Sequence, residues 1–355
     1  MVVKEMSKYQ VIIPAISQAD AEAMQAKLDH LAKPIKSLGQ LEQVACQLAG
    51  IYHSTDLKTA ERTCLVFAAD NGVVEEGVSA TPKKVTAIQA VNMMNGHTTV
   101  AALGAAYDCK VKVIDVGIDT TKPLPKVINR RIRRGTRNLL HEPAMTTEEA
   151  IKCLEIGRSA AHQAINDGAN VIITGELGMG NTTAASVMMA AILHRPAADL
   201  VGRGSKISDQ RLVHKIDVVS QALQRANLDN KTTVDPIEIL RQVGAYELGA
   251  MAGTMLGTAE AGKPFILDGF LSYAALLLAR QINADVMNYV IPSHRSHEQA
   301  SIIALNALGL TPLIDLQMCV GEGSGAMMVL PWLDGLSSIL KNMNTLEEMN
   351  FNFIP

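Results

Sequence analysis

The sequence predicts an α/β fold, with a doubly wound, largely parallel sheet that carries helices on both faces. Short apolar runs rich in β-branched residues end in Gly or Asp, and each leads into a longer stretch with the 3.6-residue period of a helix. Hydrophobic residues make up 48% of the 355-residue chain but aromatic residues only 3%. Such an aliphatic core favours helices packed on a parallel sheet over a β-sandwich. Strands alternating with helices imply right-handed crossovers.

The two ends of the chain show only helical patterns. One spans 17–33 and is followed by Pro34, and a second spans 37–52 and opens with Ser37 and Gln40 in capping-box spacing. After residue 326 the pattern is helical again. We therefore expect a small helical domain from residues 1–60 with 327–355, beside an α/β catalytic domain of residues 61–326.

Between these ends, five runs read as strands and the stretches between them as helices. The strand-like runs are 63–70, 111–118, 170–178, 263–270 and 288–294, and clear helical patterns cover 146–167 and 208–226. In an open α/β sheet, ligands bind at the carboxyl ends of the strands. Carboxylates or a histidine stand near the ends of these runs, at Asp70, Asp115, Glu176, Asp268 and His294. The sequence therefore predicts a reactive site at that edge.

Composition and charge exclude several classes of protein. The net charge is −3 and the short basic segment 130–138 lacks aromatic neighbours, so we expect no nucleic-acid partner. The five cysteines are widely spaced without a CxxC pair, which indicates core thiols in a reducing compartment and no zinc site. No apolar segment reaches the roughly 20 residues of a membrane span, and the N-terminus lacks a signal-peptide core. We expect a soluble cytoplasmic protein.

Two glycine-containing segments are candidate anion sites. In "GELGMGNTTAA" (175–185), free N–H groups at a helix start can face an anion, although an ordinary capped turn explains Asn-Thr-Thr equally well. Capping does not explain Glu176 at the strand end. In "VGRGSK" (201–206), Gly202, Gly204 and Lys206 precede a helix that carries Lys215, which alone is more typical of a solvated surface lysine. Gln89, on an otherwise apolar or small-residue helix, reads most simply as a surface or core amide.

The segment "GEGSGA" (321–326) places a carboxylate among three glycines. A tight turn before a helix is the plain interpretation, and a GxGxG without a clear preceding strand is weak support for a dinucleotide or methyl-donor loop. Glu322 would repel a phosphate. A carboxylate among glycines fits better as a general base that is partly shielded from water.

Taken together, the motifs resemble the nicotinate-nucleotide–dimethylbenzimidazole phosphoribosyltransferases of cobamide lower-ligand synthesis. The resemblance runs in order from about Lys33 to Ala326. It is carried by "KPIKSLGQLE", "AADNGVVEEGVSATPKKVTAIQ", "VIDVGID", "RGTRN", "PAMT", "TGELGMGNTT", "VGRGS", "LDGFLSYAAL", "IPSH" and "GEGSGA".

The resemblance implies a pentosyltransferase that moves the 5-phosphoribosyl group of nicotinate mononucleotide to 5,6-dimethylbenzimidazole or a related base. The products are α-ribazole 5′-phosphate, formed with inversion, and nicotinate. Nicotinate leaves as an already cationic pyridinium and no pyrophosphate departs, so no acid, metal or cofactor is expected. One base that takes the benzimidazole N–H proton is the minimum requirement.

The resemblance also implies site residues and an assembly. Glu322 matches the proton acceptor and Glu176 a second acid near the ribose or leaving group. The implied substrate-binding residues are Thr81, Gln89, Leu177, Gly178, Met179, Gly204, Lys215, Ser293, Gly321 and Gly323, with Lys215 near the 5′-phosphate. The glycines around Glu322 would let a flat base lie against the backbone. Members of the family are homodimers.

Three departures from the family pattern leave alternatives open. Asn71 stands where a His is more usual, Lys36 replaces a common Gly, and Lys206 stands where a Gly is frequent. An acceptor other than a benzimidazole, such as adenine or a phenol, is one alternative. A subunit that holds mononucleotide but needs a paralogous partner is another. The GxGxG of residues 321–325, rather than these departures, prompts a third alternative, a dinucleotide- or methyl-donor-dependent enzyme.

Overall fold

The computed structural model describes residues 9–204, 207–229 and 233–350. Within these residues, six strands form one parallel sheet in the order β3-β2-β1-β4-β5-β6. The strands are β1 (Arg62–Ala69), β2 (Cys109–Gly117), β3 (Ile128–Asn129), β4 (Val171–Leu177), β5 (Phe265–Leu267) and β6 (Val290–Pro292). The doubly wound α/β fold expected from the sequence is confirmed.

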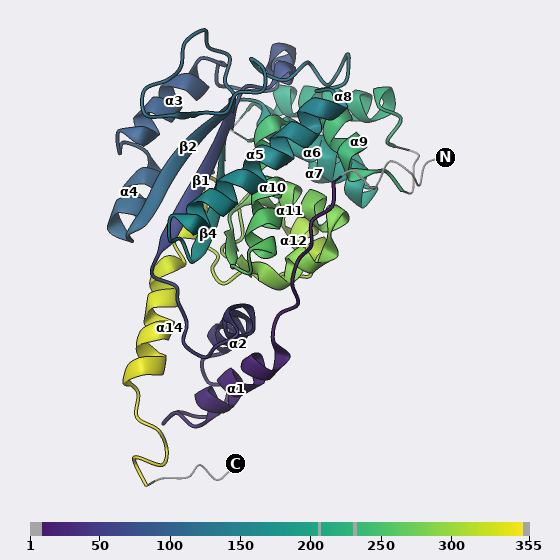
Figure 1. Ribbon diagram of the computed structural model, residues 1–355. Helices are drawn as coiled ribbons and strands as arrows, with labels where there is room; N and C mark the ends of the chain where they lie inside the picture. The colour runs from purple at the N-terminus through teal and green to yellow at the C-terminus, as the bar shows by residue number, and fades with distance from the viewer. Residues whose placement is uncertain (1–8, 205–206, 230–232, 351–355) are drawn as a thin grey trace.

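Helices cover both faces of this sheet. Their bounds are α1 (Gln18–Asp29), α2 (Gln40–Tyr52), α3 (Val85–Met94), α4 (Thr99–Ala106), α5 (Thr147–Asn166), α6 (Asn181–Leu193), α7 (Ala197–Leu200), α8 (Asp209–Arg225), α9 (Pro236–Val243), α10 (Tyr246–Glu260), α11 (Phe270–Ile282), α12 (Ser301–Leu308), α13 (Ser324–Met327) and α14 (Leu330–Asn342), with 3-10 helices η2 (Gly72–Glu76) and η3 (Ala284–Tyr289). Helices α5, α10 and α11 contact one face, while α3, α4 and α13 contact the other (Figure 1).

The order of the strands reverses between β1 and β4, which are hydrogen-bonded neighbours. From β1 the chain crosses toward β2 and β3 on one side, and from β4 toward β5 and β6 on the other. At such a switch point the loops that follow adjacent strands diverge, which opens a crevice at their carboxyl ends. The residues that follow β1 and β4 are therefore placed beside a ligand crevice by topology alone.

The helix starts follow local capping chemistry, with one correction. At α5 the Thr146 hydroxyl accepts from the Glu149 amide and the Glu149 carboxylate accepts from the Thr146 amide, which is a complete capping box. The capping box expected at Ser37 is wrong. Helix α2 begins at Gln40, and its N-cap Gly39 has a φ of 58° and makes no side-chain cap bond. Glycine adopts this positive φ without steric cost, so the helix begins here without a capping hydroxyl.

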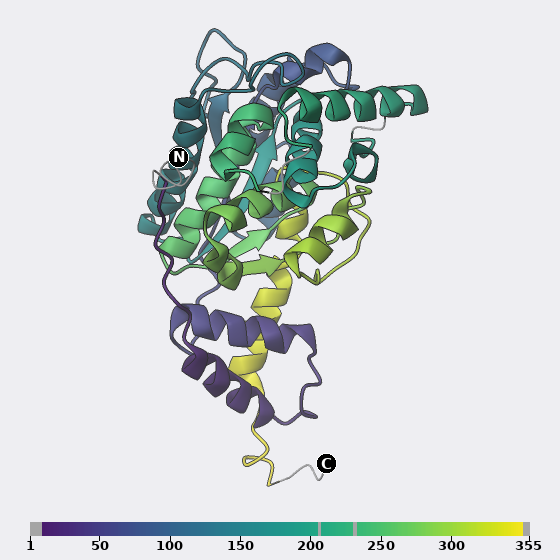
Figure 2. The ribbon, with the colours of Figure 1, turned by 90° about the vertical axis from the view of Figure 1, so that its right-hand side faces the viewer.

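Helices α1, α2 and α14 lie together below the sheet, so the two ends of the chain come side by side (Figures 1 and 2). Backbone bonds join them, because Ala32 N–H donates to Asn344 O at 2.9 Å and Leu346 N–H donates to His30 O at 2.8 Å. Residues 9–16 instead run up along the α/β part, where Tyr9 packs in the core. The division into a helical and a catalytic domain stays a prediction.

No helix in the described parts of the chain has the length and apolarity needed to cross a membrane.

Candidate active site

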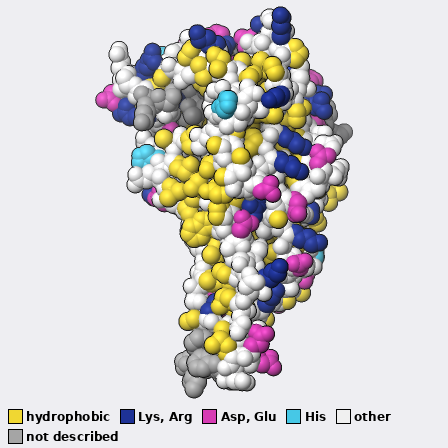
Figure 3. Space-filling view, turned by 90° about the vertical axis from the view of Figure 1, so that its left-hand side faces the viewer, with side chains coloured by type: hydrophobic (Ala, Val, Ile, Leu, Met, Phe, Trp, Pro, Cys, Tyr) yellow, Lys and Arg dark blue, Asp and Glu magenta, His cyan; other side chains and the backbone are white. Residues whose placement is uncertain are grey.

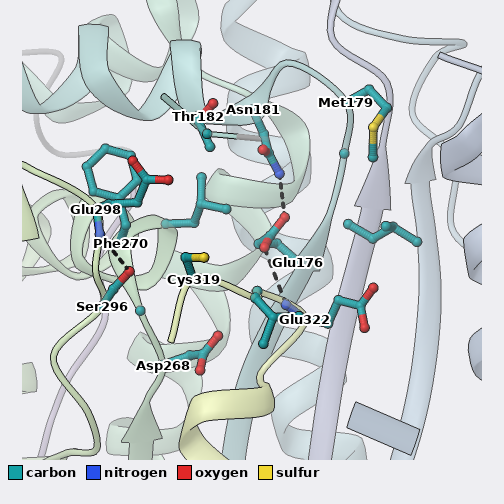
Figure 4. A pocket seen from close by; sticks show the side chains of 17 residues that line it. Glu176, Met179, Asn181, Thr182, Asp268, Phe270, Ser296, Glu298, Cys319 and Glu322 are labelled. Atoms are coloured by element: carbon teal, nitrogen blue, oxygen red, sulfur yellow. Dashed lines mark hydrogen bonds between the residues drawn. The ribbon is translucent and has the colours of Figure 1, made fainter. Parts of the chain in front are cut away.

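A cavity of about 230 Å³ opens at the carboxyl ends of β4 and β5, beside the switch point (Figure 4). It is lined by Glu176, Leu177, Gly178, Met179, Asn181, Thr182, Gly204, Asp268, Gly269, Phe270, Leu271, Ser296, Glu298, Cys319, Val320, Gly321 and Glu322. In Figure 4, Glu176 sits in the middle, with Met179 and Glu322 to its right and Phe270, Ser296 and Glu298 to its left.

Glu322 lies in a short loop that other buried groups hold in place. Its φ is 69°, a left-handed conformation that side chains other than glycine rarely adopt, and its carboxylate Oε1 accepts from Gln89 Nε2 at 3.0 Å. Burial raises the pKa of the Glu322 carboxyl, the Gln89 hydrogen bond opposes this rise, and the charge of Asp268 adds to it. A carboxylate with a raised pKa and one fixed hydrogen bond is suited to accept a proton at neutral pH.

The three glycines of "GEGSGA" each make room for a protein side chain. A Cβ on Gly321 would collide with Glu176 Oε1, and one on Gly325 would collide with the His294 ring. Gly323, with a φ of 90°, would place its Cβ 2.9 Å from Cys64 Sγ. The glycines are thus required by close protein packing. Of the three, only Gly321 lines the cavity, so a flat base resting on all of them is not what the geometry offers.

Glu176, the last residue but one of β4, is almost completely buried. One of its oxygens accepts from Asn181 Nδ2, and the other accepts from the Glu322 amide at 3.4 Å (Figure 4). Burial raises the pKa of Glu176 to about 8 against these two hydrogen bonds, and the nearby charges of Glu322 and Asp268 add to the rise. Glu176 is therefore mostly protonated at neutral pH.

Asp268, just beyond β5, fixes the loop that carries Glu322. Its buried carboxylate accepts from Gly323 N–H at 3.1 Å and from Ala326 N–H at 2.9 Å, at the start of α13. His294 Nδ1 lies 3.9 Å from Asp268 Oδ1. Burial raises the pKa of Asp268, while the charge of His294 and these amide donors lower it. Sequence reasoning noted Asp268 as a strand end but did not assign it this role.

Lys215 on α8 lies at the other end of the cavity, one layer behind its wall. The side chain is 1% exposed, and Nζ donates to Thr182 Oγ1 at 2.9 Å and to Gly202 O at 3.2 Å. Within the described ranges, no carboxylate lies within 4 Å of the ammonium. Burial lowers its pKa to about 8. The acid whose charge acts on it is the more distant Glu298, which opposes this fall only in part. A buried ammonium without a contacting carboxylate, beside Thr182 and Gly204 of the wall, is suited to an anionic ligand.

The predicted site residues divide into three groups. Those that line the cavity are Glu322, Glu176, Leu177, Gly178, Met179, Gly204 and Gly321. Gln89 and Lys215 stand directly behind the wall and hold Glu322 and Thr182. Thr81, Ser293 and Gly323 do not line it. The Ser293 hydroxyl is buried and donates to Leu267 O, and the half-buried Thr81 exchanges hydrogen bonds with Ser79.

Sequence reasoning missed several residues of the cavity wall. They are Asn181, Thr182, Phe270, Leu271, Ser296, Glu298, Cys319 and Val320. Asn181 and Thr182 were interpreted as N-cap residues, but Gly180, with a φ of 86°, is the N-cap of α6. This frees the Asn181 amide to bind Glu176, and the Glu at the strand end was the available signal. The segment 313–322 has no helical or strand pattern, so nothing indicated that it lies alongside the residues that follow β6, where Ile314 O and Met318 O accept from the Arg295 and His297 amides.

The three departures from the family pattern fall in different places. Asn71 is buried after β1 and donates to Glu247. Lys36 is exposed near the α1–α2 connection with a φ of 58°, which explains why a glycine suits that position. Lys206 lies outside the described residues.

Comparisons with known proteins agree with this geometry. A family model described as phosphoribosyltransferase matches residues 13–350. A nicotinate-nucleotide–dimethylbenzimidazole phosphoribosyltransferase of Escherichia coli (strain SE11) is 42% identical over 339 residues, which cover 95% of this chain and 94% of the relative. A protein of the same name from Shigella sonnei (strain Ss046) is also 42% identical, over 95% of this chain and 94% of its own length.

A solved structure also indicates the same family. The crystal structure of a nicotinate-nucleotide–dimethylbenzimidazole phosphoribosyltransferase from Thermus thermophilus superposes with a TM-score of 0.89 at 37% identity. The match covers 96% of this chain and all of that one. The chain therefore belongs to the nicotinate-nucleotide–dimethylbenzimidazole phosphoribosyltransferase family.

Proposed function

We propose that this protein transfers the 5-phosphoribosyl group of nicotinate mononucleotide to 5,6-dimethylbenzimidazole, or a closely related base, as a step in assembling the nucleotide loop of cobalamin. The names of the relatives support this reaction, and so does the chemistry of the cavity. The observation that carries it is Glu322, a half-buried carboxyl of raised pKa that Gln89 aims within the cavity.

The proposed reaction needs one proton acceptor. One ring nitrogen of the base forms a bond to the anomeric carbon as the bond from that carbon to the nicotinate nitrogen breaks, and the pyridinium takes the bonding pair and leaves as neutral-ring nicotinate. The N–H proton of the base passes to Glu322. Glu176, mostly protonated at neutral pH, adds little negative charge beside the ribose and can donate or accept a hydrogen bond there.

The other end of the cavity suits the 5′-phosphate. Among the described residues Lys215 contacts no carboxylate within 4 Å, although the charge of the more distant Glu298 acts on it, and it holds the Thr182 hydroxyl. A phosphate that reached Thr182 and Gly204 would therefore pair with its charge. Holding both substrates between Lys215 and Glu322 would bring the ring nitrogen in line with the anomeric carbon, and such positioning can contribute about 7–11 kcal/mol to lowering a bimolecular barrier.

The test is release of nicotinate by the purified protein. We expect release from nicotinate mononucleotide only when an acceptor base is added, with α-ribazole 5′-phosphate identified by mass spectrometry. A panel of 5,6-dimethylbenzimidazole, benzimidazole, adenine and phenol ranks the acceptors. If none of them gives release, the proposed function is wrong, and release that appears only after a paralogous subunit is added would assign the chain as a partner-dependent subunit.

We also propose that the enzyme works as a cytoplasmic homodimer, as the family resemblance implies. Its five cysteines are free thiols, which suits a reducing compartment. Hydrophobic side chains gather on the face above the narrow lower part of the molecule (Figure 3), and a surface of this kind is typical of a subunit contact. Light scattering should give twice the 38.0 kDa mass of the chain, and a monomer at micromolar concentration would contradict the proposal.

A further inference from the structure

A buried amide and a buried carboxyl lie under the turn that follows β4. Asn71 is 1% exposed and Glu247, in the first turn of α10, is 0% exposed. Asn71 Nδ2 donates to Glu247 Oε1 at 2.7 Å. The other oxygen of each side chain, Asn71 Oδ1 and Glu247 Oε2, is buried and has no hydrogen-bond partner among the described residues.

The charge state of Glu247 decides whether these two oxygens are satisfied. An ionised carboxylate can only accept, so Oε2 and Asn71 Oδ1 would both stay unpaired in a site without water contact, which is costly. A neutral carboxyl carries one O–H donor. It can donate from Oε2 to Asn71 Oδ1 while Oε1 accepts from Asn71 Nδ2, which satisfies both side chains with two parallel hydrogen bonds.

The surroundings of Glu247 favour the neutral form. The groups whose charges act on its pKa are Glu176 on β4 and Asp70 after β1, and both are acids. The buried Cys153 thiol on α5, on whose pKa Glu247 acts, is not a cation either. Burial raises the pKa of Glu247 to about 8, whereas the Asn71 bond and a backbone bond lower it. The start of a helix favours an ionised acid, but this effect is smaller than the cost of burying a carboxylate without a cation.

The pair supports a wall of the cavity. A Cβ on Gly178 would lie 2.5 Å from Glu247 Oε1, 2.6 Å from Ala69 O and 3.2 Å from Asn71 Nδ2, so this glycine rests directly on the hydrogen bond. Its neighbours Leu177 and Met179 line the cavity. The turn is also held through Met179 N–H, which donates to Thr86 Oγ1 at 3.4 Å. Displacing the pair would move Gly178 and, with it, the apolar wall.

We infer that Asn71 and neutral Glu247 form an acid–amide pair with two hydrogen bonds, and that this pair positions the Leu177–Met179 wall for the acceptor base. The part of this inference that concerns the acceptor rests on the proposed function. Asn71 and Glu247 are positioning residues, because Gly178 separates them from the cavity. A histidine, the residue more usual at position 71 by the family resemblance, would instead pair with Glu247 as imidazolium and carboxylate.

Two substitutions of Glu247 test the pair by its chemistry. Glu247→Gln keeps both hydrogen bonds, because the new amide N–H replaces the acid O–H, and Glu247→Leu removes both. We expect Glu247→Gln to retain the wild-type KM for the acceptor. Glu247→Leu should raise that KM about tenfold, the effect of losing a buried hydrogen bond, with kcat and the KM for nicotinate mononucleotide changed less than about threefold. An equal rise in both KM values would mean a merely structural role and overturn the positioning inference.

Infrared spectroscopy tests the charge state without any activity. The spectrum of wild type minus Glu247→Gln at pH 7 should show a protonated-carboxyl C=O band that is absent from the variant, and Asn71→His should lose that band as well. A carboxylate band in the difference spectrum would overturn the acid–amide pair. This measurement also covers the case in which Glu247→Leu does not fold. If wild type turns over no base, the proposed function fails, while the infrared result still decides the pair.

Discussion

The two ends of the cavity hold buried ionisable groups that burial affects in opposite ways. At one end burial raises the pKa of Glu322, and Gln89 partly opposes this rise. At the other end burial lowers the pKa of Lys215 to about 8, and the charge of the more distant Glu298 opposes this fall only in part. Withdrawal from water therefore turns the carboxyl into a better proton acceptor and leaves the ammonium in need of an anion. Burial therefore prepares Glu322 to accept a proton and Lys215 to bind an anion.

The largest expected effect comes from removing the proton acceptor, Glu322. Glu322→Gln keeps the size and the hydrogen bond to Gln89 but cannot take a proton, so we expect kcat to fall by about 10²–10⁴. The KM for nicotinate mononucleotide should stay near wild type, because Lys215 is untouched. Nicotinate release at saturating substrates measures this, with the exposed Glu347→Gln as a matched control. Turnover like that of wild type would remove Glu322 from the chemistry.

The second largest expected effect comes from removing the positive charge of Lys215. Lys215→Met removes the charge but keeps much of the aliphatic packing, and hydrogen bonds to charged groups are worth about 1.5–3 kcal/mol. We expect the KM for nicotinate mononucleotide to rise by about 10- to 100-fold while the KM for the acceptor changes little. The exposed Lys341→Met serves as the control. If instead the acceptor KM rose and the mononucleotide KM did not, the two ends would be assigned the wrong way round.

A third prediction disturbs Glu176, between the two ends. Gly321→Ala places a methyl group against Glu176 Oε1, so the carboxyl must move away from the Glu322 amide. Such misplacement should lower kcat by about tenfold, with smaller changes in either KM. Gly335→Ala is the control, since a Cβ there meets nothing within 4 Å. Full activity of Gly321→Ala would show that the position of Glu176 does not matter to the reaction.

The smallest expected effect concerns the pH dependence of catalysis by Glu322. The Gln89 hydrogen bond lowers the pKa of Glu322, so Gln89→Leu should raise it further. Because the base must be ionised, the acidic limb of the kcat profile should move to higher pH, and activity near pH 6 should fall a few-fold more than activity near pH 8. A profile that loses amplitude equally at all pH values would show that Gln89 acts only on packing.

Much of the fold followed from local pattern, because buried strands and amphipathic helices carry strong periodicity. Strand β3 was missed since it has two exposed residues, Ile128 and Asn129, and pairs only at the sheet edge. The β5 and β6 strands are three residues each, shorter than the apolar runs that contain them. The run around β5 continues into residues 268–270, which line the cavity, and the run around β6 begins within η3.

Site residues could be predicted where a chemically reactive side chain stands at the end of a predicted strand, as at Glu176. Site residues were missed where only tertiary packing brings them to the site. Asp268 holds two amides of a loop more than 50 residues away, and no local pattern reveals that. A Cβ on Gly325 would collide with the His294 ring, so the requirement for glycine at this position is visible only in the three-dimensional structure. Asn71 was noticed as unusual, but its partner Glu247 lies in a helix 176 positions further on.

The most direct measurement of the role of Glu322 is a crystal structure with the acceptor base bound. We expect a ring nitrogen of the base to lie within about 3.2 Å of a Glu322 carboxylate oxygen, with Leu177 and Met179 against the ring. A ring bound at the Lys215 end, or one whose nitrogens all face away from Glu322, would contradict that role.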